Sequence, residues 1–129
     1  MTKPNERYEL VFEERPSYLV AHVNASTIDE QIAMAYLGEI ANKCDEIECE
    51  RLLFIREIPE MLPDGALFFV SADFQKMING IKTAFVNPFA KNTDSFDFAI
   101  TVAENRGANY HLFDSIPEAE KWLLEDVST

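Results

Sequence analysis

The chain has 129 residues, of which 47% are hydrophobic, and a formal net charge of −12. This length fits a single domain over residues 1–129, and no run of about 18 apolar residues predicts a transmembrane segment. The 23 acidic residues outnumber the 11 basic ones, which disfavours nucleic acid and anionic membrane surfaces as partners, because both are held mainly by Lys and Arg. The polar first residues contain no secretion signal, so we expect a cytoplasmic protein.

The first predicted elements are two strands and a helix. Apolar and polar residues alternate over Tyr8–Glu14, and a second apolar segment covers Tyr18–Val23, which together predict a hairpin. Thr27 and Glu30 have the spacing of a capping box at the start of a helix. Apolar residues then recur every three or four positions as far as Ile47, which predicts a helix of about five turns.

A buried strand and a second helix follow. Leu52–Ile55 is a continuous apolar run, as expected of a central strand with helices on both faces of the sheet. Asp64 is expected to cap the next helix. The predicted buried stripe of that helix consists of Leu67, Val70, Phe74, Met77 and Ile78.

Two further strands enclose a third helix. Lys82–Val86 is the predicted fourth strand, and Tyr110–Phe113 is the fifth. Either Thr93 or Asp94 is expected to cap the helix between them, and Gly107 to provide a left-handed residue after it.

A short last helix completes an alternating pattern. Ser115 and Glu118 form a second capping box, with Pro117 in the first turn and Trp122 among the residues facing the sheet. The order ββαβαβαβα predicts an α/β fold with four helices and a mixed five-stranded sheet of mostly parallel strands. The first hairpin strand is expected to be antiparallel to the rest.

The final strand and helix carry a family resemblance. The residues Phe113-Asp114-Ser115, then Ala119-Glu120 and Trp122-Leu123, together with the opening hairpin, resemble the SpoIIAA-like family of the STAS clan. The resemblance implies a small cytoplasmic domain that binds a protein partner, as anti-sigma-factor antagonists do, or an apolar ligand, as in the branch similar to CRAL-TRIO lipid carriers. Antagonists carry a phosphorylatable Ser or Thr after the third strand, whereas this chain has no hydroxyl residue there before Ser71.

Candidate binding residues follow the ends of the predicted strands, where ligands gather in open α/β sheets. Arg56 could hold an anionic group, and Glu60 or Asp64 could imitate a permanent phosphate charge. Alternatively, Arg56 pairs with a nearby acid and Asp64 only caps a helix. Asn87 lies at the end of the fourth strand and is the remaining candidate at this rim.

Phenylalanine is unusually frequent. The chain contains ten, most of them between positions 54 and 98, and Phe68 and Phe69 lie in a segment that is apolar nearly all around the helix. Three interpretations stay open: plain core packing, a cavity or lipid-contacting surface for a hydrophobic ligand, and a homodimer interface.

The sequence contains no recognisable catalytic or metal motif. His22 and His111 have no nucleophile placed beside them and are interpreted as structural, His22 with Asp29 or Glu30 close in sequence. Cys44 and Cys49 lack zinc spacing and are interpreted as free thiols. We therefore expect no enzyme, cofactor or metal, but a binding or regulatory module of the SpoIIAA-like type. The alternative is a carrier or sensor of a small apolar ligand, including one with peripheral membrane contact.

Overall fold

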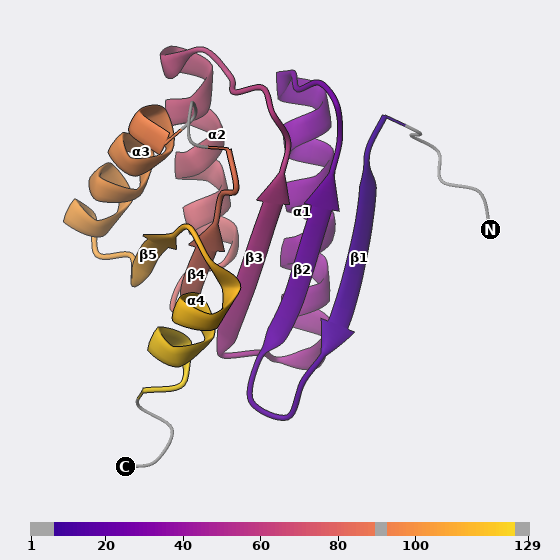
Figure 1. Cartoon of the computed structure of the whole chain (residues 1–129), viewed down its shortest axis with the longest axis vertical. Helices are drawn as coiled ribbons and strands as arrows, with labels where there is room; N and C mark the ends of the chain where they lie inside the picture. Colours follow the sequence, from indigo (N-terminus) through magenta and orange to yellow (C-terminus); the bar gives the residue numbers. More distant parts are fainter. Residues whose placement is uncertain (1–6, 90–92, 126–129) are drawn as a thin grey trace.

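The computed structural model describes residues 7–89 and 93–125. Its elements follow the predicted order and confirm the α/β class with four helices and five strands (Figure 1). They are β1 (Glu9–Glu14), β2 (Leu19–Asn24), α1 (Glu30–Ile47), β3 (Arg51–Glu57), α2 (Asp64–Met77), β4 (Lys82–Val86), α3 (Thr93–Asn105), β5 (Tyr110–Phe113) and α4 (Ile116–Leu123).

The five strands form one sheet in the sequential order β1-β2-β3-β4-β5. β1 is antiparallel to β2, and every other neighbouring pair is parallel, as predicted. The apolar run Leu52–Ile55 therefore lies in the central strand. In the observed register Phe54 of β3 is level with Phe85 of β4, which is level with Leu112 of β5.

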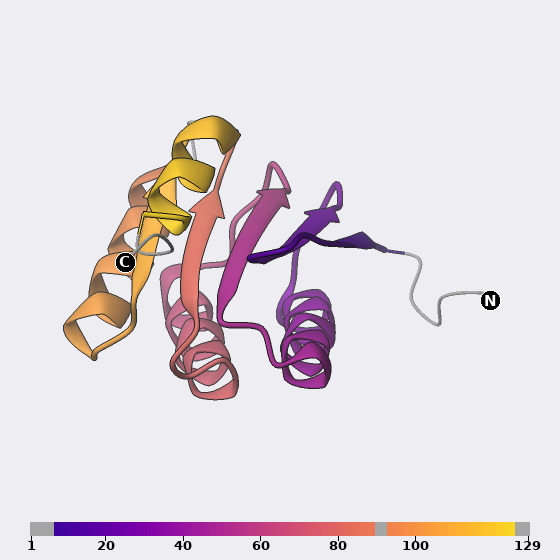
Figure 2. The ribbon, with the colours of Figure 1, turned by 90° about the horizontal axis from the view of Figure 1, so that it is seen from below.

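The helices form two unequal layers. Right-handed crossovers between consecutive neighbours keep to one face of a sheet, so α1, α2 and α3 lie side by side on one face and α4 lies on the other (Figure 2). The larger apolar core lies under the three helices. A smaller one under α4 contains Val20, Leu53, Ile55, Ala84, Val86, Ala119 and Leu123.

Alternation along β3 decides which residues enter each layer. Leu52 and Phe54 belong to the larger core, whereas Leu53 and Ile55 belong to the smaller one. Two residues beyond Phe54, Arg56 is on the face covered by the three helices. The period of the strand therefore directs a charged side chain into the larger layer.

Two predicted helix caps are wrong. The N-cap of α1 is Asp29, whose carboxylate accepts a hydrogen bond from the Ile32 backbone N–H at 2.8 Å, and not a box of Thr27 and Glu30. The N-cap of α2 is Pro63, which provides no side-chain cap, and Asp64 is already in the helix. An acidic residue in the first turn still interacts favourably with the helix dipole, which explains Asp64 there without a capping bond.

Other predictions of helix ends and faces have mixed outcomes. Both expected caps of α3, Thr93 and Asp94, lie inside that helix, and the position before it is outside the described residues. Gly107 has a φ of 98°, as predicted, and the Ser115 hydroxyl accepts from the Glu118 N–H. Met77 is 40% exposed because the buried row of α2 follows the i, i+4 positions Val70, Phe74 and Ile78, and Met77 lies at its edge.

Candidate functional site

A cavity of about 70 Å³ lies between the sheet and the three-helix layer. Its wall is mainly aromatic, and the rings contact one another in a chain that crosses the sheet. Tyr36 of α1 meets Phe54 edge-on at 6.2 Å between ring centroids, and Phe54 meets Phe85 at 5.3 Å. Phe85 in turn meets Phe96 of α3 at 5.7 Å and Tyr110 of β5 at 5.0 Å.

The phenylalanines divide between this cavity and the surface. Phe54, Phe74, Phe85 and Phe96 all line the cavity and are buried. By contrast, Phe68 is 40%, Phe69 75% and Phe98 59% exposed, on the outer sides of α2 and α3. The structure thus contains both a cavity lined by phenylalanine and an exposed apolar surface.

Arg56 is the charged residue that lines the cavity, and it is only 5% exposed. Its guanidinium donates to the carbonyl oxygens of Ile58 at 3.1 Å and Glu60 at 2.7 Å, and it lies 6.0 Å from the centroid of the Phe96 ring. The expected pairing of Arg56 with a nearby acid is wrong: within residues 7–89 and 93–125 it forms no ion pair. The loop after β3 turns its carbonyl groups, rather than a carboxylate, toward the guanidinium.

Two tyrosine hydroxyls are also buried at the cavity. Burial raises the pKa of Tyr36, while the charge and a hydrogen bond of Arg56 oppose this shift. Burial also raises the pKa of Tyr110, whose hydroxyl has no hydrogen-bond partner among the described residues. Both groups stay protonated at neutral pH and can donate a hydrogen bond to a molecule in the cavity.

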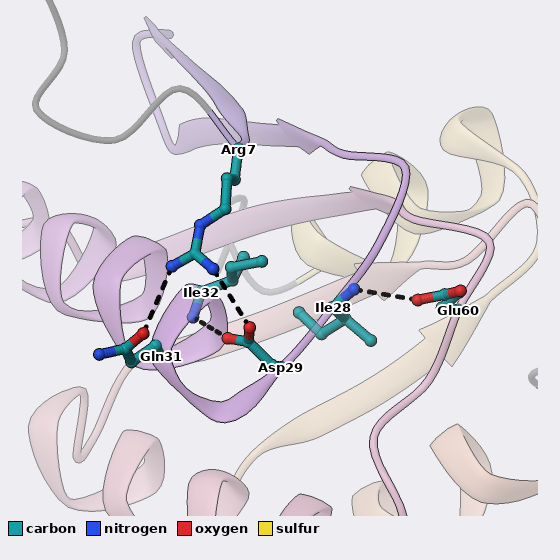
Figure 3. A network of polar contacts seen from close by, with 6 residues as sticks. All are labelled: Arg7, Ile28, Asp29, Gln31, Ile32 and Glu60. Atoms are coloured by element: carbon teal, nitrogen blue, oxygen red, sulfur yellow. Dashed lines mark hydrogen bonds and ion pairs between the residues drawn. The ribbon is translucent and has the colours of Figure 1, made fainter.

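Glu60 fixes the loop that holds Arg56. Its carboxylate accepts from the backbone N–H of Ile28 at 3.2 Å (Figure 3), and its backbone carbonyl accepts from Arg56. On the same side, Arg7 bonds to the Asp29 carboxylate at 3.3 Å and to Gln31 at 3.5 Å. Glu60 therefore ties the β3–α2 loop to the β2–α1 loop, and Ile28 in the latter lines the cavity.

The remaining predicted site residues lie elsewhere. Asp64 is exposed at the start of α2, and Phe68 and Phe69 point away from the cavity. Asn87 is buried, but its amide nitrogen donates to the Phe89 carbonyl at 3.0 Å and its amide oxygen accepts from the Phe89 N–H. It closes the turn after β4, so Arg56 alone of the predicted residues reaches the cavity.

The expected binding rim at the strand-end loops stays a prediction: one open hollow there is lined by Asn24 and Pro59, and another by Asn87 and Asp114. Such a binding crevice opens where neighbouring crossovers leave a sheet toward opposite faces. Here α1, α2 and α3 all cover one face, so these crossovers do not part. The aromatic cavity lies inside the layer, beneath the helices, and not at this rim.

Sequence reasoning missed several residues of the cavity wall. Tyr36 belongs to the apolar stripe predicted for the helix that ends near Ile47, and Tyr110 to the predicted fifth strand; neither position by itself predicts a binding residue. The available signal was chemical: a tyrosine at a core position needs a partner for its hydroxyl, and two of them with one buried arginine indicate a polar group inside an apolar layer.

His22 lies on the other face of the sheet. Its Nε2 is 2.7 Å from the carboxylate of Glu57, on the neighbouring strand. The cavity wall contains no carboxylate among the described residues. Cys44 and Cys49 are free thiols; a hydrogen bond with Cys49, together with burial, raises the pKa of Cys44.

Comparisons with known proteins leave the family open. No protein-family model matches this sequence, and a search of curated proteins finds no match. Within the described part of the chain, the helices are too short or too polar for any of them to cross a membrane. Function is therefore inferred from the cavity and its residues.

Proposed function

We propose that this chain is a non-enzymatic binding module of the SpoIIAA-like or STAS type that takes up a small apolar molecule in its internal cavity. The observation that carries the proposal is the aromatic cavity itself, with Phe54, Phe74, Phe85 and Phe96 in its wall. Sites for small ligands are typically apolar with a few convergent polar groups, and this cavity combines its rings with Arg56. A carrier or sensor role fits such a site.

Filling the cavity is expected to weaken binding strongly. Ala103 of α3 lines the cavity and is buried, so Ala103→Leu would place a larger side chain in the space. Octanol is the probe, and its binding is followed by the amide chemical shifts of cavity residues in two-dimensional NMR. We expect saturable shifts in the wild type and a loss of affinity of about tenfold or more in the variant.

Thr101→Leu provides the matched control, because Thr101 is on the same helix but exposed. It should bind octanol like the wild type. Equal binding by all three proteins, or no binding by the wild type, would contradict uptake into this cavity. Native mass spectrometry of protein purified from cells then gives the mass of any natural occupant.

A second candidate function is recognition of a protein partner, including a second copy of the chain. The supporting observation is the exposed surface of Phe68, Phe69 and Phe98 on the two packed helices α2 and α3. The Arg106 guanidinium lies 5.1 Å from the centroid of the Phe68 ring and covers part of it. Phe69, at 75% exposure, is the least covered of the three.

Self-association through this surface has a direct readout. Light scattering of concentrated wild-type protein is expected to give twice the chain mass of 14.7 kDa, and the Phe69→Ser variant is expected to return to the single mass. Lys76→Ser, at another exposed position on α2, is the control and should behave like the wild type. A wild type that stays at 14.7 kDa at every concentration would exclude the dimer.

A further inference from the structure

Two polar groups in the cavity lack a complementary group among the described residues: Arg56 has no opposite charge beside it, and the Tyr110 hydroxyl has no hydrogen-bond partner. Arg56 carries a positive charge at 5% exposure, and among the described residues only neutral groups contact its guanidinium. A buried charge without an opposite charge is costly to a folded protein. The second group is the Tyr110 hydroxyl, the buried side-chain polar atom that has no hydrogen bond in the described part of the chain.

The register of the sheet offsets the backbone positions of Arg56 and Tyr110 along the strands. Phe54, Phe85 and Leu112 are level with one another on β3, β4 and β5. Arg56 is two residues after Phe54, whereas Tyr110 is two residues before Leu112. At a rise of about 3.3 Å per residue, their backbone positions are offset by about 13 Å along the strands.

Between the backbone positions of Arg56 and Tyr110 the cavity wall is mainly aromatic. The rings of Phe54 and Phe85 contact each other along this wall, and Phe85 also contacts the Tyr110 ring. At the Arg56 end, the guanidinium has five N–H donors, of which the carbonyl groups of Ile58 and Glu60 engage two and the Tyr36 hydroxyl engages a third. Donors therefore remain for an oxyanion, and a planar guanidinium is matched in geometry to a carboxylate.

We infer that the occupant is an apolar organic anion: a carboxylate held by Arg56, a hydrocarbon body along the aromatic wall, and a second hydrogen-bonding group that meets the Tyr110 hydroxyl. This inference rests on the proposed function and defines the chemical class of its ligand. The carboxylate supplies the missing opposite charge, and the second group satisfies the unpaired hydroxyl. An entirely apolar guest would leave both buried groups as costly as they are in the empty protein.

Three ligands of equal chain length test the two polar ends separately. Octanol, octanoate and ω-hydroxyoctanoate are titrated calorimetrically into the full chain at neutral pH, where the acids are ionised. For the wild type we expect octanoate to bind about 10- to 100-fold more tightly than octanol, because its charged hydrogen bonds to Arg56 are formed out of water. We expect ω-hydroxyoctanoate to bind still more tightly, by about fivefold.

Variants assign each preference to its residue. Arg56→Met is expected to remove the advantage of octanoate over octanol, and Arg56→Lys to restore part of it. Arg51→Met is the matched control: Arg51 is also on β3 and donates to a backbone carbonyl, that of Leu123, but it does not line the cavity. Its ligand preferences should equal those of the wild type.

Substitution of Arg56 also removes its hydrogen bonds to the loop after β3. Tyr110→Phe provides a second test that leaves this loop unchanged. Among the described residues no hydrogen bond is lost in this variant, so its melting temperature should equal or exceed that of the wild type. Octanoate should bind unchanged, and the extra affinity of ω-hydroxyoctanoate should disappear.

The possible outcomes separate the inference from the proposed function. Equal binding of octanol and octanoate by the wild type, or an octanoate preference that survives in Arg56→Met, would overturn the anion inference and leave uptake of an apolar molecule intact. No binding of any of the three ligands would overturn both.

Discussion

Replacing Phe54 with alanine is expected to lower the free energy of unfolding by about 3 to 5 kcal/mol. Phe54 is 2% exposed at the centre of the sheet, and its ring contacts those of Tyr36, Phe74 and Phe85. Its loss removes apolar contacts on every side and enlarges an existing cavity, which the surrounding strands cannot close. Urea unfolding followed by circular dichroism measures the change.

Phe98→Ala is the control for this large effect. The Phe98→Ala variant loses the same kind of side chain, but from a position on α3 that is 59% exposed. Its free energy of unfolding should therefore change by no more than about 0.5 kcal/mol. Similar losses in both variants would contradict the central position of Phe54. The slope of the free energy of unfolding against urea concentration should be the same in Phe54→Ala as in the wild type. This would show that unfolding exposes the same amount of surface in both proteins.

Alkaline pH is expected to unfold the protein, because the pKa of each of the four tyrosines is raised in the folded state. Burial and a hydrogen bond to Glu39 raise the pKa of Tyr8 to about 12, and burial and a hydrogen bond to Glu120 raise the pKa of Tyr18 to about 12. In the unfolded chain tyrosine ionises near pH 10.

The sign of the effect follows from proton binding. Between about pH 10 and about pH 12 the unfolded chain has lost tyrosine protons that the folded chain retains, so the free energy of unfolding falls as the pH rises. The contribution is fully present below about pH 10 and is lost as the pH passes the folded-state values. Urea midpoints across this range, with tyrosinate absorbance measured in parallel, give both quantities.

A double variant, Tyr8→Phe and Tyr18→Phe, should weaken this alkaline dependence, because two of the shifted groups are absent. Tyrosinate absorbance that rises near pH 10 while the circular dichroism of the folded chain is unchanged would contradict protected hydroxyls. The wild-type absorbance should instead increase together with unfolding.

The sequence predicted the elements well because local periodicity is strong in this chain. The alternation in β1 and the three- and four-residue spacing in α1 each fixed an element within a few residues. The caps of α1 and α2 were harder, since several polar residues precede each helix and only the path of the chain decides which one bonds to the first turn. Thr27 and Asp29 illustrate this: both are N-cap types, and Asp29 makes the bond.

The site was predicted only at Arg56. A charged residue that directly follows an apolar run was visible in the sequence, but its partners were not, because they are carbonyl groups of a loop. Tyr36 and Tyr110 come together through the order of strands and helices, which brings α1 and β5 to one cavity from positions far apart in the chain. Periodicity assigns each to an interior and cannot show that the two share it.

The two margins of the sheet carry a consequence for solubility. β5 at one margin has only four residues, and β1 at the other exposes Glu9, Glu13 and Glu14. Short or charged outer strands resist the addition of a further strand from another molecule, because repulsion between like charges opposes backbone pairing. Concentrated protein should therefore resist fibril growth through β1. Replacing these glutamates with neutral residues should allow a strand of another molecule to pair with β1.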